Sequence, residues 1–118
     1  MQYNVEFYYT QSGEKPVAGF IAQLREKHPD LHKLVKAGIK KLEDGRKHRK
    51  PLTRLVDPEH GIYELRVGGK NIARVFWFFQ AGRVVILTNG YVKKKQKLDS
   101  AELLWARECK KDWEERTG

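Results

Sequence analysis

The chain has 118 residues, a length that suits one folded domain, and we expect residues 1–118 to form a single domain. Hydrophobic residues make up 40% of it and aromatic residues 11%, which is too apolar for a disordered basic tail. Lys and Arg outnumber Asp and Glu by 24 to 15, which gives a net charge of +9. Such an excess favours a protein that binds nucleic acid or an anionic membrane; the alternative is an ordinary soluble basic protein without such a partner.

The lone Cys109 excludes both a disulfide framework and a cysteine-based zinc site. The first residues form no apolar signal segment, and no run approaches the roughly 18 apolar residues of a membrane helix. The longest apolar stretch, residues 75–79, is the size of a strand. These features lead us to expect a soluble cytoplasmic protein that does not contact a membrane.

The N-terminal half predicts one strand followed by two helices. Residues 3–9 alternate in character, which is typical of a strand. Pro16 suits the first turn of a helix, and that helix should end at His28, because the residue before a proline leaves the α region. We expect Asp30 to cap a second helix and Gly45 to end it. The two helices would form an antiparallel hairpin.

The C-terminal half predicts a run of strands and a last helix. Aromatic and β-branched residues indicate strands over residues 62–67, 72–79 and 83–91, and residues 52–56 could add a short one. Asp99 and Glu102 resemble the ends of a capping box that opens a helix to about Arg116. Trp105 and Trp113, on one side of that helix with Cys109 between them, are expected to lie in the core.

The predicted order is therefore β-α-α-β(3-4)-α. This order makes the fold class α+β, with an antiparallel twisted sheet, an N-terminal helical hairpin, a C-terminal helix, and the helices against one face of the sheet. No HExxH, GxSxG, P-loop or GxGxxG motif occurs, and the four histidines lack metal-ligand spacing. We expect neither a metal nor another cofactor.

Two arginines stand inside otherwise apolar predicted strands: Arg66 in the strand of residues 62–67 and Arg74 in the strand of residues 72–79. A two-residue turn at Gly68-Gly69 would put them on opposite faces of the sheet, whereas a three-residue turn over residues 68–70 puts both on one face. The longer turn also sets Glu64 opposite Arg74, a favourable pair, and we favour it. A purely structural Glu64–Arg74 ion pair is the alternative to a catalytic role.

Two basic segments flank these strands. One follows the last strand and contains Lys93, Lys94, Lys95, Gln96 and Lys97, and the other contains Arg46, Lys47, Arg49 and Lys50. Crowded like charges repel one another, and a polyanion relieves that repulsion. The alternative for both segments is a solvated connection without a binding role.

At these residues the sequence resembles the HigB-like members of the RelE/ParE toxin superfamily. Residues 61–66 (GIYELR) are similar to the family's "G-lW-ELR", residues 73–77 (ARVFW) to "yRi-fy", and residues 86–94 (ILTNGYVKK) to "lLhGF-KK". Gln96-Lys97 continues the family's "-tQK-", and the motifs occur in the family's order. The sequence departs from the family at Asn89, where a histidine is common; an amide can donate a hydrogen bond but cannot shuttle a proton.

The resemblance implies the toxin of a type II toxin–antitoxin system, a metal-independent ribonuclease that cleaves mRNA on the ribosome. The 2′-OH of the substrate would attack the adjacent phosphate, and a partner antitoxin, expected to be a small helix-turn-helix protein, would hold the toxin inactive. Fixed cations can stabilise the charge that develops on the phosphate. The implied catalytic residues are Arg66, Arg74, Lys93 and Lys94. The implied substrate-binding residues are Glu64, Asn89, Tyr91, Lys95, Gln96, Lys97, Arg46, Lys47, Arg49 and Lys50.

Two other functions stay open. A toxin of the same superfamily could poison a topoisomerase by binding, without nuclease residues. A non-enzymatic RNA-binding accessory protein could stack bases on Phe76 and Phe78. Cleavage of mRNA at codons that disappears with Arg66→Ala would separate the nuclease from both.

Overall fold

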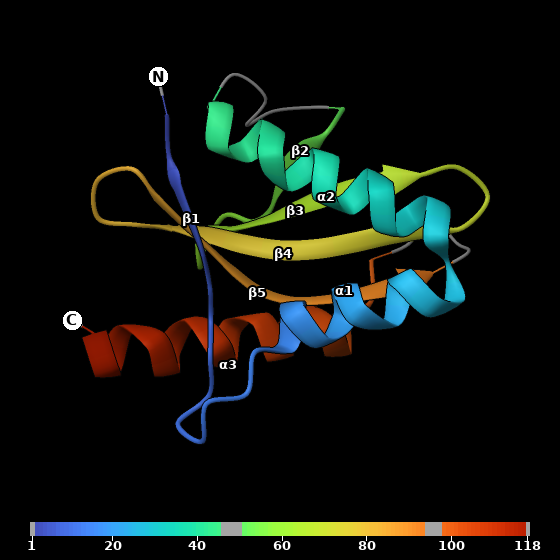
Figure 1. The fold of residues 1–118 in the computed structure, drawn as a ribbon. Helices are drawn as coiled ribbons and strands as arrows, with labels where there is room; N and C mark the ends of the chain where they lie inside the picture. Colours follow the sequence, from blue (N-terminus) through green and yellow to red (C-terminus); the bar gives the residue numbers. More distant parts are fainter. Residues whose placement is uncertain (1, 46–50, 94–97, 118) are drawn as a thin grey trace.

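The computed structural model describes residues 2–45, 51–93 and 98–117. Over these residues the α+β class and the predicted order of elements are confirmed (Figure 1). The elements are β1 (Asn4–Phe7), α1 (Pro16–Lys27), α2 (Pro29–Asp44), β2 (Thr53–Asp57), β3 (Ile62–Gly68), β4 (Ile72–Gln80), β5 (Val84–Lys93) and α3 (Ser100–Thr117).

The five strands form one sheet in the order β1-β5-β4-β3-β2. The four strands β2 to β5 pair antiparallel, but β1 pairs with β5 in parallel, from Asn4 opposite Val84 to Phe7 opposite Leu87. The prediction of a wholly antiparallel sheet is therefore wrong at this edge. No hairpin turn joins β1 to β5, since two helices and three strands come between them, and the turn geometry that fixes antiparallel pairing does not apply.

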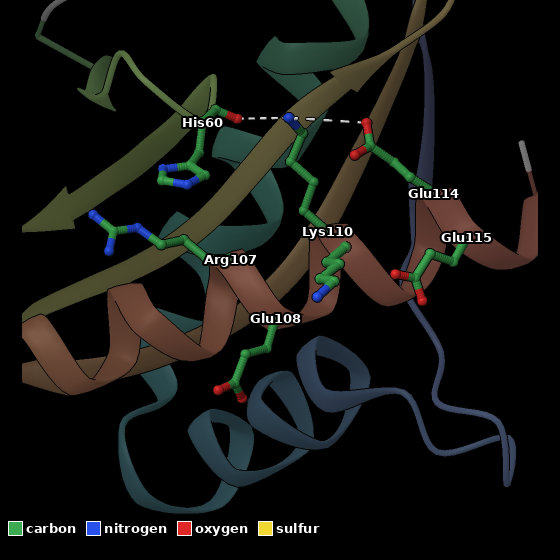
Figure 2. A pocket seen from close by; sticks show the side chains of 7 residues that line it. His60, Arg107, Glu108, Lys110, Glu114 and Glu115 are labelled. Carbon is green, nitrogen blue, oxygen red and sulfur yellow. Dashed lines mark hydrogen bonds and ion pairs between the residues drawn. The ribbon is translucent and has the colours of Figure 1, made fainter.

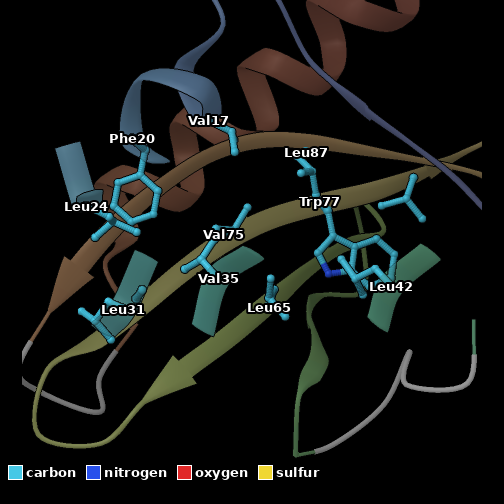
Figure 3. Close-up of a cluster of buried hydrophobic side chains, with 12 residues drawn as sticks. Val17, Phe20, Leu24, Leu31, Val35, Leu42, Leu65, Val75, Trp77 and Leu87 are labelled. Carbon is cyan, nitrogen blue, oxygen red and sulfur yellow. The ribbon is translucent and has the colours of Figure 1, made fainter. Parts of the chain in front are cut away.

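Helices cover both faces of the sheet, so the prediction that they lie against one face is wrong (Figure 1). The helices α1 and α2 pack on one face, and α3 packs on the other through Leu103, Ala106, Cys109 and Trp113. Every residue of β4 from Ile72 to Phe78 is buried, because the strand is covered on both sides. Figure 3 shows the core on the first face, which includes Val17, Phe20, Leu24, Leu31, Val35, Leu42, Leu65, Val75, Trp77 and Leu87.

Most helix ends lie where the sequence predicted them. Pro16 is the first residue of α1, His28 follows its last, and Gly45 ends α2 in the left-handed region at φ 77°. Asp30 does not cap α2, because Pro29 already occupies its first position and His28 its N-cap. Asp99 does cap α3, where its Oδ1 accepts hydrogen bonds from the backbone N–H groups of Ala101 and Glu102 at 3.0 and 3.2 Å.

The tryptophans of α3 have different environments. Trp113 is 4% exposed and lies in the core as predicted, but Trp105 is 43% exposed and that prediction is wrong. Four residues advance a helix by about 40° beyond a full turn, so two such steps place Trp105 about 80° from Trp113. The stripe that faces the sheet runs through Leu103, Ala106 and Cys109 and leaves Trp105 at its margin.

The turn between β3 and β4 fixes how the two arginines face each other. It has three residues, as predicted, but they are residues 69–71, so Arg66 lies opposite Arg74 and Glu64 opposite Phe76. Gly68 ends β3 at φ 111°, and a Cβ there would lie 2.3 Å from the carbonyl oxygen of Asn71. The prediction that both arginines share a face is confirmed, whereas the direct pairing of Glu64 with Arg74 is wrong by two residues.

Candidate functional site

Polar side chains gather on the α3 face of the sheet, at the end where β3 finishes, β4 begins and α3 starts. Strand alternation and the observed register bring six of them to one face from four strands, and Asp99 joins them from the residue before α3. We call this set the arginine cluster; it comprises Arg54, Glu64, Arg66, Arg74, Tyr91, Lys93 and Asp99.

Arg66 and Arg74 form the centre of the arginine cluster. Like charges directly opposite each other in a sheet are destabilising. Arg66 is partly exposed and lines a surface depression with Lys41, Pro51, Leu52, Val67 and Gly68. Arg74, directly opposite Arg66 in the register, is completely buried. Of the two predicted catalytic arginines, Arg66 is therefore the one that a ligand can reach directly.

Glu64 joins two arginines of the cluster. Its side chain is completely buried, its Oε2 accepts a hydrogen bond from Nη1 of Arg74 at 2.9 Å, and its Oε1 lies 3.5 Å from Nε of Arg54. The Glu64–Arg74 ion pair considered from the sequence is thus present, although the two residues are diagonal neighbours across the strands. A charged partner is what allows a carboxylate to be buried in this way.

Sequence reasoning missed Arg54. Its signal was of the same kind as that of Arg66 and Arg74, a cation inside an apolar stretch, here residues 52–56. The position gains meaning only from the pairing of β2 with β3, which sets Arg54 directly opposite Glu64. That pairing depends on the irregular register at the end of β2, which composition does not reveal.

The end of β5 meets the start of α3 beside the arginine cluster. The Tyr91 hydroxyl accepts a hydrogen bond from the backbone N–H of Asp99 at 3.0 Å, and burial raises the pKa of Tyr91. Nζ of Lys93 lies 3.6 Å from the Asp99 carboxylate, with both side chains about one-third exposed. The hydrogen bond from the Glu102 backbone, followed by the charge of Lys93, holds the pKa of Asp99 below its usual value. Tyr91 and Lys93 are thus both tied to the helix start.

Asn89 lies elsewhere. A β-bulge in the β4–β5 pairing turns both Thr88 and Asn89 toward α3. The buried Asn89 amide donates to the backbone carbonyl and the carboxylate of Glu102, at 3.1 and 3.2 Å. The residue that replaces the family's histidine therefore anchors α3 and does not reach the open side of the arginine cluster.

Eight predicted site residues lie outside the part of the chain that the structure describes: Lys94, Lys95, Gln96, Lys97, Arg46, Lys47, Arg49 and Lys50. The two aromatic residues considered for base stacking, Phe76 and Phe78, are completely buried in the core under α3. They cannot stack with a nucleic-acid base, so that prediction is wrong.

A comparison with known families assigns the chain. A model of the family described as "Phage derived protein Gp49-like (DUF891)" matches residues 21–111. The chain belongs to this Gp49-like family. The family is a RelE-like toxin family of toxin–antitoxin systems. The match runs from α1 into α3 and contains the whole arginine cluster. No curated protein matches the sequence.

The Gp49-like chain has a second polar region between the β2–β3 turn and α3 (Figure 2). The buried Asp57 carboxylate accepts a 2.6 Å hydrogen bond from Nε of Arg107 and lies 3.0 Å from Nδ1 of His60. Nζ of Lys110 donates to the His60 carbonyl at 2.6 Å and lies 3.8 Å from Glu114. We call these five residues the helix clasp, because they tie α3 to the turn between β2 and β3.

The charge of Asp57 is part of this clasp. Burial alone would raise the pKa of the Asp57 carboxyl, but hydrogen bonds from Arg107 and His60 outweigh it and hold the pKa below 3.8. The pocket beside the clasp is lined by His60, Arg107, Lys110 and Lys111 and also by Glu108, Glu114 and Glu115. The three glutamates offset the charge of the basic residues in this lining, which does not favour a polyanion.

Within residues 2–45, 51–93 and 98–117, no group of three or more His, Cys, Asp or Glu side chains is placed to hold a metal ion. Over the same ranges, no helix combines the length and the apolar character needed to cross a membrane.

Proposed function

We propose that this Gp49-like chain is the toxin of a type II toxin–antitoxin system, of the HigB-like branch, and that it cleaves mRNA on the ribosome in the cytoplasm. The observation that carries the proposal is the direct opposition of Arg66 and Arg74 across β3 and β4. Glu64 pairs with Arg74, while Arg66 has no carboxylate partner among the described residues. An RNA phosphate at Arg66 would relieve the repulsion between the two arginines.

The reaction needs a group that stabilises negative charge. The 2′-oxygen forms a bond to phosphorus as the bond from phosphorus to the 5′-oxygen breaks, leaving a 2′,3′-cyclic phosphate and a 5′-OH. Charge accumulates on the phosphate oxygens in between, and a fixed guanidinium aimed at them lowers the barrier. In this scheme Arg66 contacts the phosphate, because its planar fork matches two phosphate oxygens. Arg74 acts from behind, through its charge and by packing beside Arg66.

Two protons must also move. The 2′-OH loses its proton and the 5′-oxygen gains one, and we assign these transfers to Lys93 and Lys94. Lys93 lies on the same face as Arg74; it pairs with Ile72, two residues beyond Tyr91, the partner of Arg74. Tyr91 and the basic residues outside the described ranges would hold the flanking nucleotides and the ribosomal RNA. The proposed partners are the ribosome, its mRNA and an antitoxin, expected to be a small helix-turn-helix protein.

The test is inducible expression in a bacterial host, with growth curves and mapping of mRNA 5′ ends. Wild type should arrest growth and cut mRNA at codons, and Arg66→Ala should lower cleavage about 10²-fold or more, as expected when a transition-state donor is removed. Arg83→Ala, which removes an exposed arginine from the distant β4–β5 turn, is the matched control. Purified Arg66→Ala should melt within a few degrees of wild type, because Arg66 adds charge and little core volume.

An Arg66→Ala variant that still cleaves mRNA contradicts the proposal. If Arg66→Ala does not fold, Arg66→Lys replaces it, since a lysine keeps the charge but loses the two-pronged contact with phosphate. Arg66→Lys with full cleavage activity would also contradict the assignment.

One observation favours a second candidate, a ParE-like toxin that inhibits a topoisomerase by binding. Arg74 is completely buried, and a toxin that works by binding has no need of an accessible second arginine. Such a toxin would arrest growth with altered DNA supercoiling and intact mRNA, and Arg66→Ala would have no more effect than Arg83→Ala. The same expression experiment therefore separates the two functions.

A further inference from the structure

Arg54 extends the arginine cluster from β3 and β4 onto β2. It lies directly opposite Glu64, and the alternation of β3 places Arg66 on the same face two residues further on. Diagonal neighbours in a sheet are about 7–8 Å apart at Cα, which long side chains can span. The terminal groups of Arg54 and Arg66 can therefore meet one ligand or two adjacent groups of one ligand.

The contact between Arg54 and Glu64 is loose. Nε of Arg54 and Oε1 of Glu64 are both buried and lie 3.5 Å apart, and neither has a hydrogen-bond partner among the described residues. Glu64 already has a guanidinium at 2.9 Å, from Arg74, so Arg54 is not needed to neutralise it. An arginine whose sole role was to balance Glu64 would be expected to close to hydrogen-bond distance.

The rest of the Arg54 side chain is open to solvent. The side chain is 37% exposed although its Nε is buried, so the exposed part lies elsewhere, and the Glu64 carboxylate restricts how the guanidinium can turn. A guanidinium that is oriented in advance loses less entropy when it binds a phosphate. Arg54 and Arg74 share the Glu64 carboxylate, and Arg66 on the same face has no carboxylate partner among the described residues, so the remaining positive charge favours an anion.

We propose that Arg54 binds a phosphate group of the substrate RNA beside the one at Arg66, and that Glu64 positions both Arg54 and Arg74. This inference rests on the proposed function, because it takes the ligand at Arg66 to be RNA. It adds β2 to the binding surface and gives the buried carboxylate a positioning role.

The experiment measures binding to ribosomes whose mRNA carries 2′-O-methyl groups at the A-site codon, so that the attacking hydroxyl is absent. Binding is followed over a salt series for wild type, Arg54→Ala, Arg66→Ala and the control Arg83→Ala. Arg54→Ala should weaken binding and flatten the log–log salt slope by about 0.7, the value for one phosphate contact on a single strand. Arg83→Ala should leave the slope unchanged.

The pattern across variants distinguishes the possible failures. The proposed function, and this inference with it, would be overturned by either of two results. One is a salt slope for both Arg54→Ala and Arg66→Ala that equals that of wild type, and the other is a wild-type protein that does not bind these ribosomes. A flattened slope for Arg66→Ala beside a wild-type slope for Arg54→Ala would overturn the inference alone. If Arg54→Ala fails to fold, protection of Arg54 from phenylglyoxal in wild type decides: protection by bound ribosomes supports the contact, and equal modification overturns it.

Glu64→Gln tests the positioning role separately. The variant keeps all three arginines and removes one negative charge, so ribosome binding should stay equal or become tighter. Cleavage of unmodified mRNA should fall at least tenfold, because a neutral amide holds the two guanidinium groups less firmly. A variant that loses binding and cleavage together, or keeps both, would contradict the positioning role of Glu64.

Discussion

The arginine cluster and the helix clasp both lie on the α3 side of the sheet, yet they differ in the balance of their charges. In the clasp, Arg107 and Lys110 each have a carboxylate within 4.0 Å, and the imidazole of His60 has one as well. The arginine cluster has four cations and two carboxylates, Glu64 and Asp99. Charges that are already paired hold structure together, whereas surplus charge of one sign is available for a partner.

The difference also explains why a net charge of +9 could not locate the site by itself. Basic residues occur in both regions, and α3 carries several of them. What separates the regions is which strand pairs with which, because register decides whether a cation faces a carboxylate or another cation.

The helix α3, which carries three of the clasp residues, should be stabilised mainly by the apolar side chains that it packs against the sheet. Trp113 is 4% exposed and packs edge-on against Tyr8, so Trp113→Ala should lower the free energy of unfolding by about 3–5 kcal/mol. Trp105→Ala is the matched control and should cost less than about 1 kcal/mol, because Trp105 is 43% exposed. Urea unfolding of both variants measures the difference, and equal losses would contradict the packing described for α3.

Breaking the clasp should weaken the fold and spare the site. Arg107→Ala removes the 2.6 Å contact to Asp57 and should cost about 1–2 kcal/mol, less than for a fully buried pair because Arg107 is partly exposed. Lys111→Ala removes an exposed lysine of the same helix and is the control. Cleavage by the folded Arg107→Ala protein should remain at the wild-type level. A loss of cleavage without a loss of stability would mean that the clasp belongs to the site.

The sequence predicted the elements of this fold better than their arrangement. Proline and glycine restrict the backbone locally, and the helix ends predicted at Pro16 and Gly45 are confirmed. The placement of α3 on the second face and the parallel pairing of β1 depend on contacts between distant segments. The apolar run at residues 75–79 predicted a strand, but it did not reveal that helices cover both faces of β4.

The site was predictable in part for the same reason. Arg66 and Arg74 stood out because a cation inside an apolar strand is unusual, and the shared face followed from the turn length. The direct opposition of these two arginines, the burial of Arg74 and the position of Arg54 required the register. Asn89 was placed in the site by its motif, whereas the bulge in β5 turns it toward α3.

Acid should affect the clasp through Asp57. Its pKa is below 3.8 in the folded protein, so its charge contributes stability above about pH 4, and that contribution is lost as the pH falls through the folded value. Wild type should therefore lose more stability than Asp57→Asn between about pH 5 and pH 3. Melting temperatures of the two proteins across this range provide the measurement. Parallel curves would mean that the Asp57 carboxylate contributes no pH-dependent stability.

The smallest expected effect compares two lysines that differ in little except their surroundings. Lys93 lies 3.6 Å from Asp99 at the arginine cluster, and Lys110 lies 3.8 Å from Glu114 in the clasp, with side chains that are 31% and 22% exposed. Each surface ion pair contributes little to stability, so Lys93→Gln and Lys110→Gln should both melt close to wild type. The melting temperature of Lys110→Gln should be slightly lower, because this variant also loses the hydrogen bond to the His60 carbonyl.

Ribosome binding should separate the same two variants. Lys93→Gln should flatten the log–log salt slope by about 0.7, because one phosphate contact is lost, and Lys110→Gln should leave the slope as it is. The change is small for one residue, so the two variants must be measured side by side over the same salt series, in an Arg66→Ala background that prevents cleavage. Equal slopes would mean that surplus charge at the sheet end does not mark the binding surface. A flattened slope for Lys110→Gln alone would move that surface to the clasp.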